Sequence, residues 1–112
     1  MGDIGSGHAK RLLCRRCEAE VSPTNSTLEV AGAIDHTCTN PAGITYDIRC
    51  YASAPGLLAD EPPCAEHAWF EGYAWQIGLC RSCGVHLGWC FTGPERPPFA
   101  GLIRRRVEER DG

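Results

Sequence analysis

HAWFEGYAWQIGLCRSCGVHLGWCF, residues 67–91, contains all three tryptophans of the chain and one C-x-x-C pair. Apolar residues alternate with others through 75–79 and again through 85–91, which is the period of two expected of half-buried β-strands. The C-R-S-C-G segment between these runs ends at Gly84, and glycine is typical of a tight turn. The stretch therefore predicts two neighbouring strands joined by a turn, with indole rings presented on one face.

Three tryptophans so close in sequence have two structural explanations. They can fill a packed sheet face or wall a pocket, because an indole is costly to expose and is rarely fully buried. The alternation places Trp75 and Trp89 on neighbouring strands and Trp69 in the loop before them. Spacing alone leaves both explanations open.

Four of the eight cysteines form two C-x-x-C pairs, Cys14 with Cys17 and Cys80 with Cys83. Four thiolates are the usual ligands of a closed, tetrahedral structural zinc site. We therefore predict a zinc ion that joins the start of the chain to its middle, so that metal-binding energy becomes folding energy. Two disulfide or redox-active pairs are the alternative.

Length and charge restrict the class of protein. A chain of 112 residues is expected to form one domain with a modest core, which a cross-link would help. The net charge of −3 disfavours general nucleic-acid binding, which needs a basic surface. Residues 1–13 lack the apolar run of a secretory signal, and no stretch approaches the ~20 residues of a membrane span. We therefore expect a cytoplasmic protein with reduced thiols and no membrane partner.

The expected organisation is a single domain with short polar ends. Residues 1–11 are predicted to be a disordered leader that is rich in Gly and Ser. The folded domain is predicted to span 12–107. Residues 108–112 are expected to be a charged, solvated tail.

Elements outside the tryptophan stretch are less clearly marked. Residues 44–50 alternate apolar and polar side chains, which predicts a strand, and a shorter strand is expected over 28–33. A polar connection with the turn signal N-P-A-G is expected over 35–43, and a long loop rich in Pro, Gly, Ala and Asp over 53–63. Apolar residues after position 98 indicate a last strand or a short helix.

Several motifs together resemble one known family. They are H-A-W-F-E-G-Y-A-W at 67–75, H-L-G-W-C-F at 86–91, F-A-G-L-I at 99–103 and N-P-A-G at 40–43, in register with the two C-x-x-C pairs. This set is similar to the CULT domain, the thalidomide-binding domain of cereblon and of its single-domain bacterial relatives. The resemblance covers about residues 12–107.

The resemblance implies an all-β protein with the β-tent fold, in which two antiparallel sheets are pinned by one structural zinc ion. It also implies a cage formed by Trp69, Trp75 and Trp89, with Phe91 at a position where the family carries an aromatic residue. The implied ligands are glutarimides such as thalidomide, lactams, uracil-like rings, and cyclised Asn or Gln at the C-termini of proteins. Such a cage binds its ligand without catalysis.

Individual roles follow from the same resemblance. His67 would bond an imide through its backbone carbonyl and side chain, and the backbone N–H of Trp69 would bond an imide carbonyl. Asn40 and Pro41 would close the cage from the facing loop. A flat ring with a donor between two acceptors suits apolar walls with a few fixed polar partners. The full set of ligand-binding residues expected is Asn40, Pro41, Glu66, His67, Ala68, Trp69, Trp75, Trp89 and Phe91.

The sequence also departs from the family pattern. Ala68 stands where cereblon has a serine, and Phe91 lacks a phenol that some bacterial relatives carry. Both changes are expected to tune affinity rather than abolish binding. No part of this chain resembles the Lon-like domain or the helical adaptor-binding region of animal cereblon, so ubiquitin-ligase function is not expected of it.

Two other functions are compatible with parts of the pattern. Methionine sulfoxide reductase B shares a zinc-knuckled, tent-like architecture, but its nucleophilic cysteine lies later in the chain, and no cysteine follows Cys90 here. A three-tryptophan cage could also read a quaternary ammonium group by cation–π contact, with Glu66 or Glu71 adding negative charge. His86 is expected to be a satisfied structural residue. The remaining thiols are expected to be small buried or incidental side chains, namely Cys38, Cys50, Cys64 and Cys90.

Overall fold

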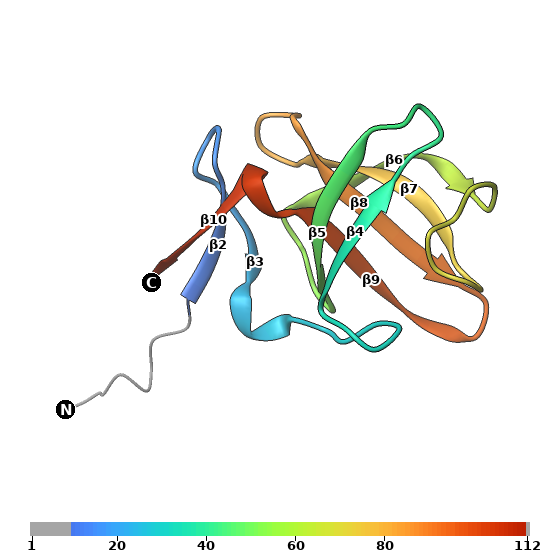
Figure 1. The fold of residues 1–112 in the computed structure, drawn as a ribbon. Helices are drawn as coiled ribbons and strands as arrows, with labels where there is room; N and C mark the ends of the chain where they lie inside the picture. Colours follow the sequence, from blue (N-terminus) through green and yellow to red (C-terminus); the bar gives the residue numbers. More distant parts are fainter. Residues whose placement is uncertain (1–9, 112) are drawn as a thin grey trace.

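The computed structural model describes residues 10–111, which form two antiparallel β-sheets (Figure 1). The small sheet has the strand order β10-β2-β3, and the large sheet has the order β4-β5-β9-β8-β7-β6. Within the described range there is no α-helix, only two short 3-10 turns. The predicted all-β fold with two antiparallel sheets is confirmed. No helical segment of residues 10–111 has the length and apolar character needed to cross a membrane.

The elements follow one another in short connections. The small sheet contains β2 (Lys10–Cys14), β3 (Glu20–Pro23) and β10 (Val107–Asp111). The large sheet contains β4 (Asp35–Thr39), β5 (Thr45–Tyr51), β6 (Leu57–Cys64), β7 (Ala74–Cys80), β8 (His86–Gly93) and β9 (Arg96–Ile103). The 3-10 turns are η1 (Thr24–Ser26) and η2 (Arg104–Arg106).

Two apolar clusters make up the core. One joins the two sheets and includes Leu12, Val21 and Val107 from the small sheet together with Leu87 and Leu102 from the large sheet. The other is formed mainly by aromatic and aliphatic residues of β5, β8 and β9 and by the loop before β7; its buried members are Ile48, Cys50, Phe70, Trp89, Phe91, Phe99 and Ile103. The large sheet therefore buries side chains on both faces.

The strands in and around the tryptophan stretch agree with the sequence. β7 and β8 pair with each other, and the C-R-S-C-G segment forms the turn between them. The strand predicted over 44–50 is β5. The apolar residues after position 98 belong to strands, because Leu102 and Ile103 lie in β9 and Val107 begins β10.

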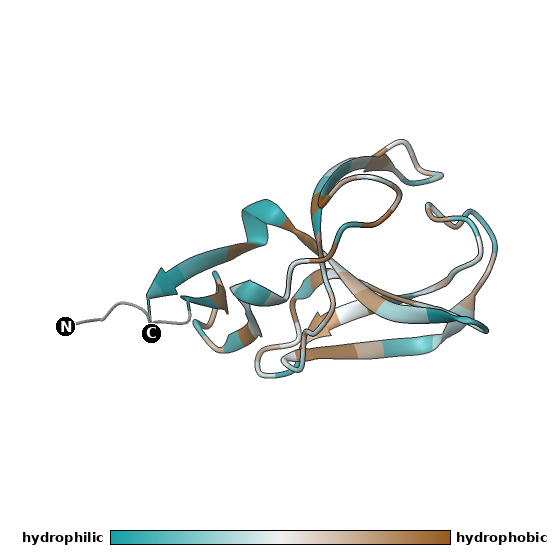
Figure 2. Cartoon of the chain, turned by 90° about the horizontal axis from the view of Figure 1, so that it is seen from below, coloured by the Kyte–Doolittle hydropathy of each residue, from teal (hydrophilic) through white to brown (hydrophobic). Residues whose placement is uncertain are grey.

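Two polar segments, one near each end of the chain, differ from expectation. Lys10 and Arg11, expected in the leader, lie in β2, and 108–111, expected to be a solvated tail, belong to β10. These two segments pair with each other, from Val107 opposite Cys14 to Asp111 opposite Lys10. β10 is hydrophilic along most of its length (Figure 2). Its charged side chains show no apolar alternation, so the sequence did not predict this strand, which backbone pairing with β2 stabilises. Residues 1–9, also assigned to the leader, and residue 112, assigned to the tail, lie outside the described residues.

The outer strands of the large sheet were also missed. β4 lies within the expected polar connection 35–43, and β6 lies mostly within the expected loop 53–63. Both are edge strands of the large sheet, where exposed polar residues and prolines are tolerated. The short strand expected over 28–33 is wrong, since only isolated bridges occur there.

A β-bulge interrupts the pairing of β7 with β8. Gly78 lies opposite Gly88, but Leu79 lies opposite His86, so Leu87 is the extra residue. A bulge shifts the alternation by one residue, so side chains on its two sides no longer follow the same pattern of faces. Leu87 therefore packs between the sheets, while His86 lies on the same face as Trp89.

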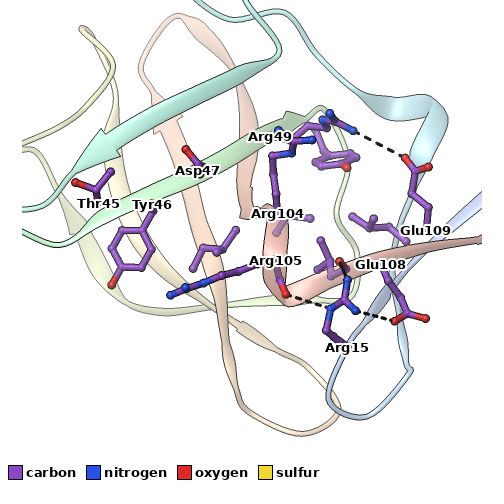
Figure 3. Close-up of a pocket in the computed structure, with 14 residues that line it drawn as sticks. Arg15, Thr45, Tyr46, Asp47, Arg49, Arg104, Arg105, Glu108 and Glu109 are labelled. Carbon is purple, nitrogen blue, oxygen red and sulfur yellow. Dashed lines mark hydrogen bonds and ion pairs between the residues drawn. The ribbon is translucent and has the colours of Figure 1, made fainter.

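Charged residues line a groove of about 640 Å³ between the two sheets. Figure 3 shows Arg49 of β5 directed at Glu109 and Arg15 directed at Glu108, with N–O distances of 3.9 and 3.4 Å. Exposed ion pairs of this kind contribute little, typically under about 1 kcal/mol each. The sheets are therefore held together mainly by the apolar cluster between them and by the cysteines described below.

Gly88 can be tested as a requirement of the sheet. A Cβ atom at this position would overlap the carbonyl oxygen of Gly101 on β9, which is backbone and cannot move away cheaply. We predict that Gly88→Ala lowers the free energy of unfolding by about 2–3 kcal/mol, measured by urea denaturation. Gly32→Ala is the control, because Gly32 has a φ of +89° but open space around it, and should cost about 1 kcal/mol. Equal losses in the two variants would contradict the predicted overlap.

Candidate functional site

The two C-x-x-C pairs converge on one point. All four Sγ atoms lie within 4.8 Å of one another, with 3.8 Å between Cys14 and Cys83 and 3.6 Å between Cys17 and Cys80. A disulfide would require about 2.05 Å. A tetrahedral site with metal–sulfur bonds of about 2.3 Å has sulfur–sulfur edges of roughly 3.8 Å. The geometry fits a metal site, and we refer to it as the four-cysteine cluster.

The two halves of the cluster have the same backbone turn. The carbonyl of Cys14 accepts the N–H of Glu18 at 2.7 Å, and the carbonyl of Cys80 accepts the N–H of Gly84 at 2.8 Å. The fourth residue after the first cysteine is left-handed in both, with φ of 66° at Glu18 and 81° at Gly84. The glycine that marked the second turn in the sequence has no counterpart in the first, yet both turns direct two sulfurs to one point.

The thiols of the cluster differ in acidity. Burial raises the pKa of Cys14 to about 11, whereas the backbone N–H of Ala19 donates to Cys17 and lowers the pKa of that thiol to about 7. A metal cation favours the thiolate form of every ligand, because its charge offsets the cost of burying a negative one. The donor set is therefore suited to a cation that all four sulfurs share.

A second site lies on the face of the large sheet opposite the small sheet. Two cross-strand pairs form one wall of a cavity of about 210 Å³, with Trp75 opposite Phe91 and Ile77 opposite Trp89. We call it the tryptophan cavity. It is lined by Asn40, Pro41, His67, Trp69, Trp75, Ile77, His86, Trp89 and Phe91.

Two loops close the tryptophan cavity, and the indoles hold them in place. The Nε1–H of Trp75 donates to the carbonyl of Glu66 at 2.7 Å, and the Nε1–H of Trp69 donates to the carbonyl of Thr39 at 3.0 Å. The first bond ties the loop before β7 to the sheet, and the second ties it to the end of β4. Both N–H groups are thus engaged by the protein, so these rings offer their faces and edges to a ligand.

The third indole is fixed by its aromatic neighbours. Trp69, His86 and Tyr46 each meet the ring of Trp89 edge to face, with centroid distances of 4.6, 4.8 and 5.0 Å. Trp75 has no ring contact with another aromatic residue in the described part of the chain. Trp69 and Trp89 are therefore in contact, Trp75 stands apart from both, and all three line the cavity.

Comparison with known proteins identifies the family of this chain. No protein-family model matches the sequence. Cereblon from Gallus gallus is 35% identical over 106 residues that make up 88% of this chain, and cereblon from Danio rerio is 33% identical over 100 residues, or 83% of it. Cereblon from Xenopus tropicalis is 32% identical over 106 residues, again 88% of the chain. The chain is a cereblon-like CULT domain. It spans about a quarter of the length of these curated relatives, with 24, 23 and 24% of them covered in the order given.

Most of the residues predicted for the site of this CULT domain do line the cavity, and two do not. Glu66 and Ala68 are absent from the lining, although the carbonyl of Glu66 anchors Trp75. Two lining residues, Ile77 and His86, were not predicted as site residues. Alternation from Trp75 would have found Ile77. Strict alternation along β8 would not have found His86, because it places this residue on the face opposite Trp89 and ignores the bulge at Leu87.

His86 is held as a neutral imidazole. Its Nε2–H donates to the carbonyl of Gly88 at 3.0 Å, and its Nδ1 accepts from Nη1 of Arg106 at 3.4 Å. Burial lowers the pKa of His86 below its ordinary value of 6.5, and the Arg106 charge adds to this effect. The expectation of a satisfied residue is met in its hydrogen bonds, but His86 also forms part of the cavity wall.

Histidines are the only ionisable side chains among the described residues that line the cavity. Its lining contains no cysteine, serine or carboxylate side chain. Cys90 packs against the cluster between the two sheets, on the other side of the large sheet from the indoles, and burial raises the pKa of its thiol. The arrangement can enclose a small molecule, but these residues supply no nucleophile to it.

The pKa of His86 gives this CULT domain a pH-dependent stability. The pKa of His86 is lowered in the folded state. The contribution of His86 to the free energy of unfolding is therefore fully present above about pH 6.5 and is lost as the pH falls toward the lowered pKa. We predict that His86→Gln reduces the loss of unfolding free energy between about pH 7.5 and about pH 5.5, measured by urea denaturation. Leu58→Ala, which changes an exposed side chain that carries no ionisable group, is the control and should show the same pH dependence as the original protein. An unchanged pH dependence in His86→Gln would show that His86 does not titrate differently on unfolding.

Proposed function

We propose that this CULT domain binds a small, neutral imide-containing ring in the tryptophan cavity and releases it unchanged. The ligand class is glutarimides such as thalidomide, lactams, uracil-like rings, or cyclised Asn or Gln at a protein C-terminus. The observation that carries the proposal is the cavity itself, in which three indoles surround about 210 Å³. Pockets for drug-sized ligands usually have about 300–1,000 Å³, so this cavity suits a single ring.

The polar groups at the rim match the edge of an imide. Within residues 10–111 the backbone N–H of Trp69 donates to no protein acceptor, so it is free to donate to a ligand carbonyl. His67 lies beside it with a φ of 58°, a left-handed conformation that is unusual for a residue other than glycine. The apolar ring edge would pack on the indoles. For about eight heavy atoms at somewhat under 1 kcal/mol each, the expected Kd is near micromolar.

For the four-cysteine cluster we propose zinc. Four sulfur ligands at tetrahedral spacing are typical of structural zinc, and they leave no open position for a substrate. Cys14, Cys17, Cys80 and Cys83 would hold the ion as thiolates. Its role would be to fix the small sheet against the turn between β7 and β8.

The arrangement disfavours the two alternative functions. A reductase of the methionine sulfoxide type needs an accessible thiolate near its substrate, and Cys90 is on the wrong side of the large sheet, with a raised pKa. A reader of quaternary ammonium groups usually gains from a nearby carboxylate, and neither Glu66 nor Glu71 lines the cavity. Because the chain spans only about a quarter of cereblon, ubiquitin-ligase functions of that protein are not part of the proposal.

Ligand binding can be tested on Trp75, which is only half-buried and should be replaceable without unfolding. We predict that Trp75→Ala weakens binding of glutarimide and uridine by more than about tenfold, because one wall of the cavity is lost. Isothermal titration calorimetry measures the affinity. Trp75→Phe keeps an aromatic ring and should lose less.

The control for this experiment is Leu58→Ala, which removes an exposed apolar side chain on β6 outside the cavity. It should bind both rings as the original protein does. If the original protein binds neither ring at millimolar concentration while it binds choline, the proposed ligand class is wrong.

The metal can be tested by removing one ligand. We predict one zinc ion per chain by elemental analysis, and loss of both the metal and cooperative thermal unfolding in Cys83→Ser. Cys64→Ser, at a thiol outside the cluster, should retain both. A Cys83→Ser variant with unchanged melting temperature would contradict a structural metal.

A further inference from the structure

Arg106 lies behind the wall of the tryptophan cavity. It lies in η2, where β9 leaves the large sheet, and its own side chain does not line the cavity. Its Nη1 donates to the backbone carbonyl of His86 at 3.0 Å and lies 3.4 Å from Nδ1 of the same residue. Its guanidinium carbon lies 5.9 Å from the centroid of the Tyr46 ring. One arginine thus touches two of the aromatic groups that support Trp89.

These contacts determine how the back wall is built. His86 and Tyr46 both meet Trp89 edge to face, with interplanar angles of 89° and 73°. With Nε2 bound to Gly88 and Nδ1 facing Arg106, the imidazole ring has no freedom to flip without losing a bond. Tyr46 lies between the two hollows of the molecule, because it lines the inter-sheet groove (Figure 3) while its ring contacts Trp89. Arg106 therefore positions the wall through two neighbours.

The charge of Arg106 is not neutralised by a neighbouring acid. Its neighbour Arg104 lies 3.7 Å from Asp35, and Arg15 lies 3.4 Å from Glu108, but no ion pair of residues 10–111 includes Arg106. The side chain is half-buried and its partners are a carbonyl, a neutral imidazole and a phenol ring. A charge in such surroundings is screened less than an exposed one.

The tryptophan cavity contains no negative charge that could neutralise the positive charge of Arg106. None of its nine lining side chains is acidic or basic, apart from the two histidines. The nearby acids Glu66 and Glu71 are exposed to solvent, where their charges are screened. A guest with a positive charge would therefore meet a positive group behind the wall, whereas a ring with partly negative carbonyl oxygens would not be opposed.

We infer that Arg106 is a positioning and specificity-determining residue of this pocket: it fixes His86 and Tyr46 against Trp89, and its charge selects neutral, carbonyl-bearing rings over cationic guests. This inference rests on the proposed function for the identity of the guest. The positioning of His86 does not depend on any ligand. Arg106 itself contacts neither the guest nor the cavity surface.

The selectivity is tested with Arg106→Gln, Arg106→Lys and, as a matched control from the same turn, Arg104→Gln. Calorimetry gives the affinities of each for glutarimide and for choline. We expect Arg106→Gln to bind glutarimide about fivefold more weakly and choline several-fold more tightly, which changes their ratio by more than about tenfold. Arg106→Lys should keep the rejection of choline, because the charge remains, but lose part of the glutarimide affinity. Arg104→Gln should stay within about twofold for both ligands.

The positioning role is tested without ligand. Long-range ¹⁵N–¹H spectra of the histidine rings should show His86 as the Nε2–H tautomer in the original protein and in Arg104→Gln, and as a mixture of tautomers in Arg106→Gln. Melting temperature and zinc content identify a variant that is merely unfolded, and in that case Arg106→Lys carries the test.

Two results would overturn the inference. One is an unchanged ratio of glutarimide to choline affinity in a folded Arg106→Gln. The other is an unchanged His86 tautomer in the same variant. Failure of the proposed function is distinguishable, since the original protein would then bind no ring while the spectra still report whether Arg106 fixes His86.

Discussion

The convergence of four sulfurs from two distant turns is the constraint on which the rest of this domain depends. The sulfur pairs that approach within 3.8 and 3.6 Å are separated by 69 and 63 residues in the chain. Bringing such distant segments together costs chain entropy, and a metal ion shared by the four sulfurs would offset that cost with binding energy. The surface ion pairs between the sheets are too exposed to offset this entropy cost. The small sheet is positioned against the large one by this cluster and by the apolar residues around it.

The tryptophan cavity depends on a second set of interactions, which are hydrogen bonds to backbone carbonyls and contacts between aromatic rings. Two indole N–H groups are used to hold loops, and the third indole is held by three edge-to-face contacts. Trp69 and Trp89 are in contact with each other, while Trp75 is held away from them by its bond to the carbonyl of Glu66. A void between indoles can then persist in a domain with a modest core.

Metal site and cavity are coupled through the strand that both share. β8 follows directly on the second cysteine turn and carries His86 and Trp89 to the cavity. The bulge at Leu87 gives β8 two functions, since one side chain seals the space between the sheets while the next ones line the pocket. Arg106 links the two sites a second time. Its carbonyl accepts the N–H of Arg15 in the first cysteine turn.

The sequence by itself determined the β7–β8 pair, the four clustered cysteines and most residues of the cavity, including Asn40 and Pro41 from a distant turn, which the family resemblance supplied. Apart from the residues that the resemblance supplied, these features are local patterns, in which alternation and C-x-x-C spacing fix which side chains project together. Only the tertiary structure decided the side of His86, the pairing of the charged strand β10 with β2, and the edge strands β4 and β6. The reason is that a register shift and the pairing of polar strands depend on backbone hydrogen bonds to distant partners, and those bonds leave no trace in the order of apolar and polar side chains.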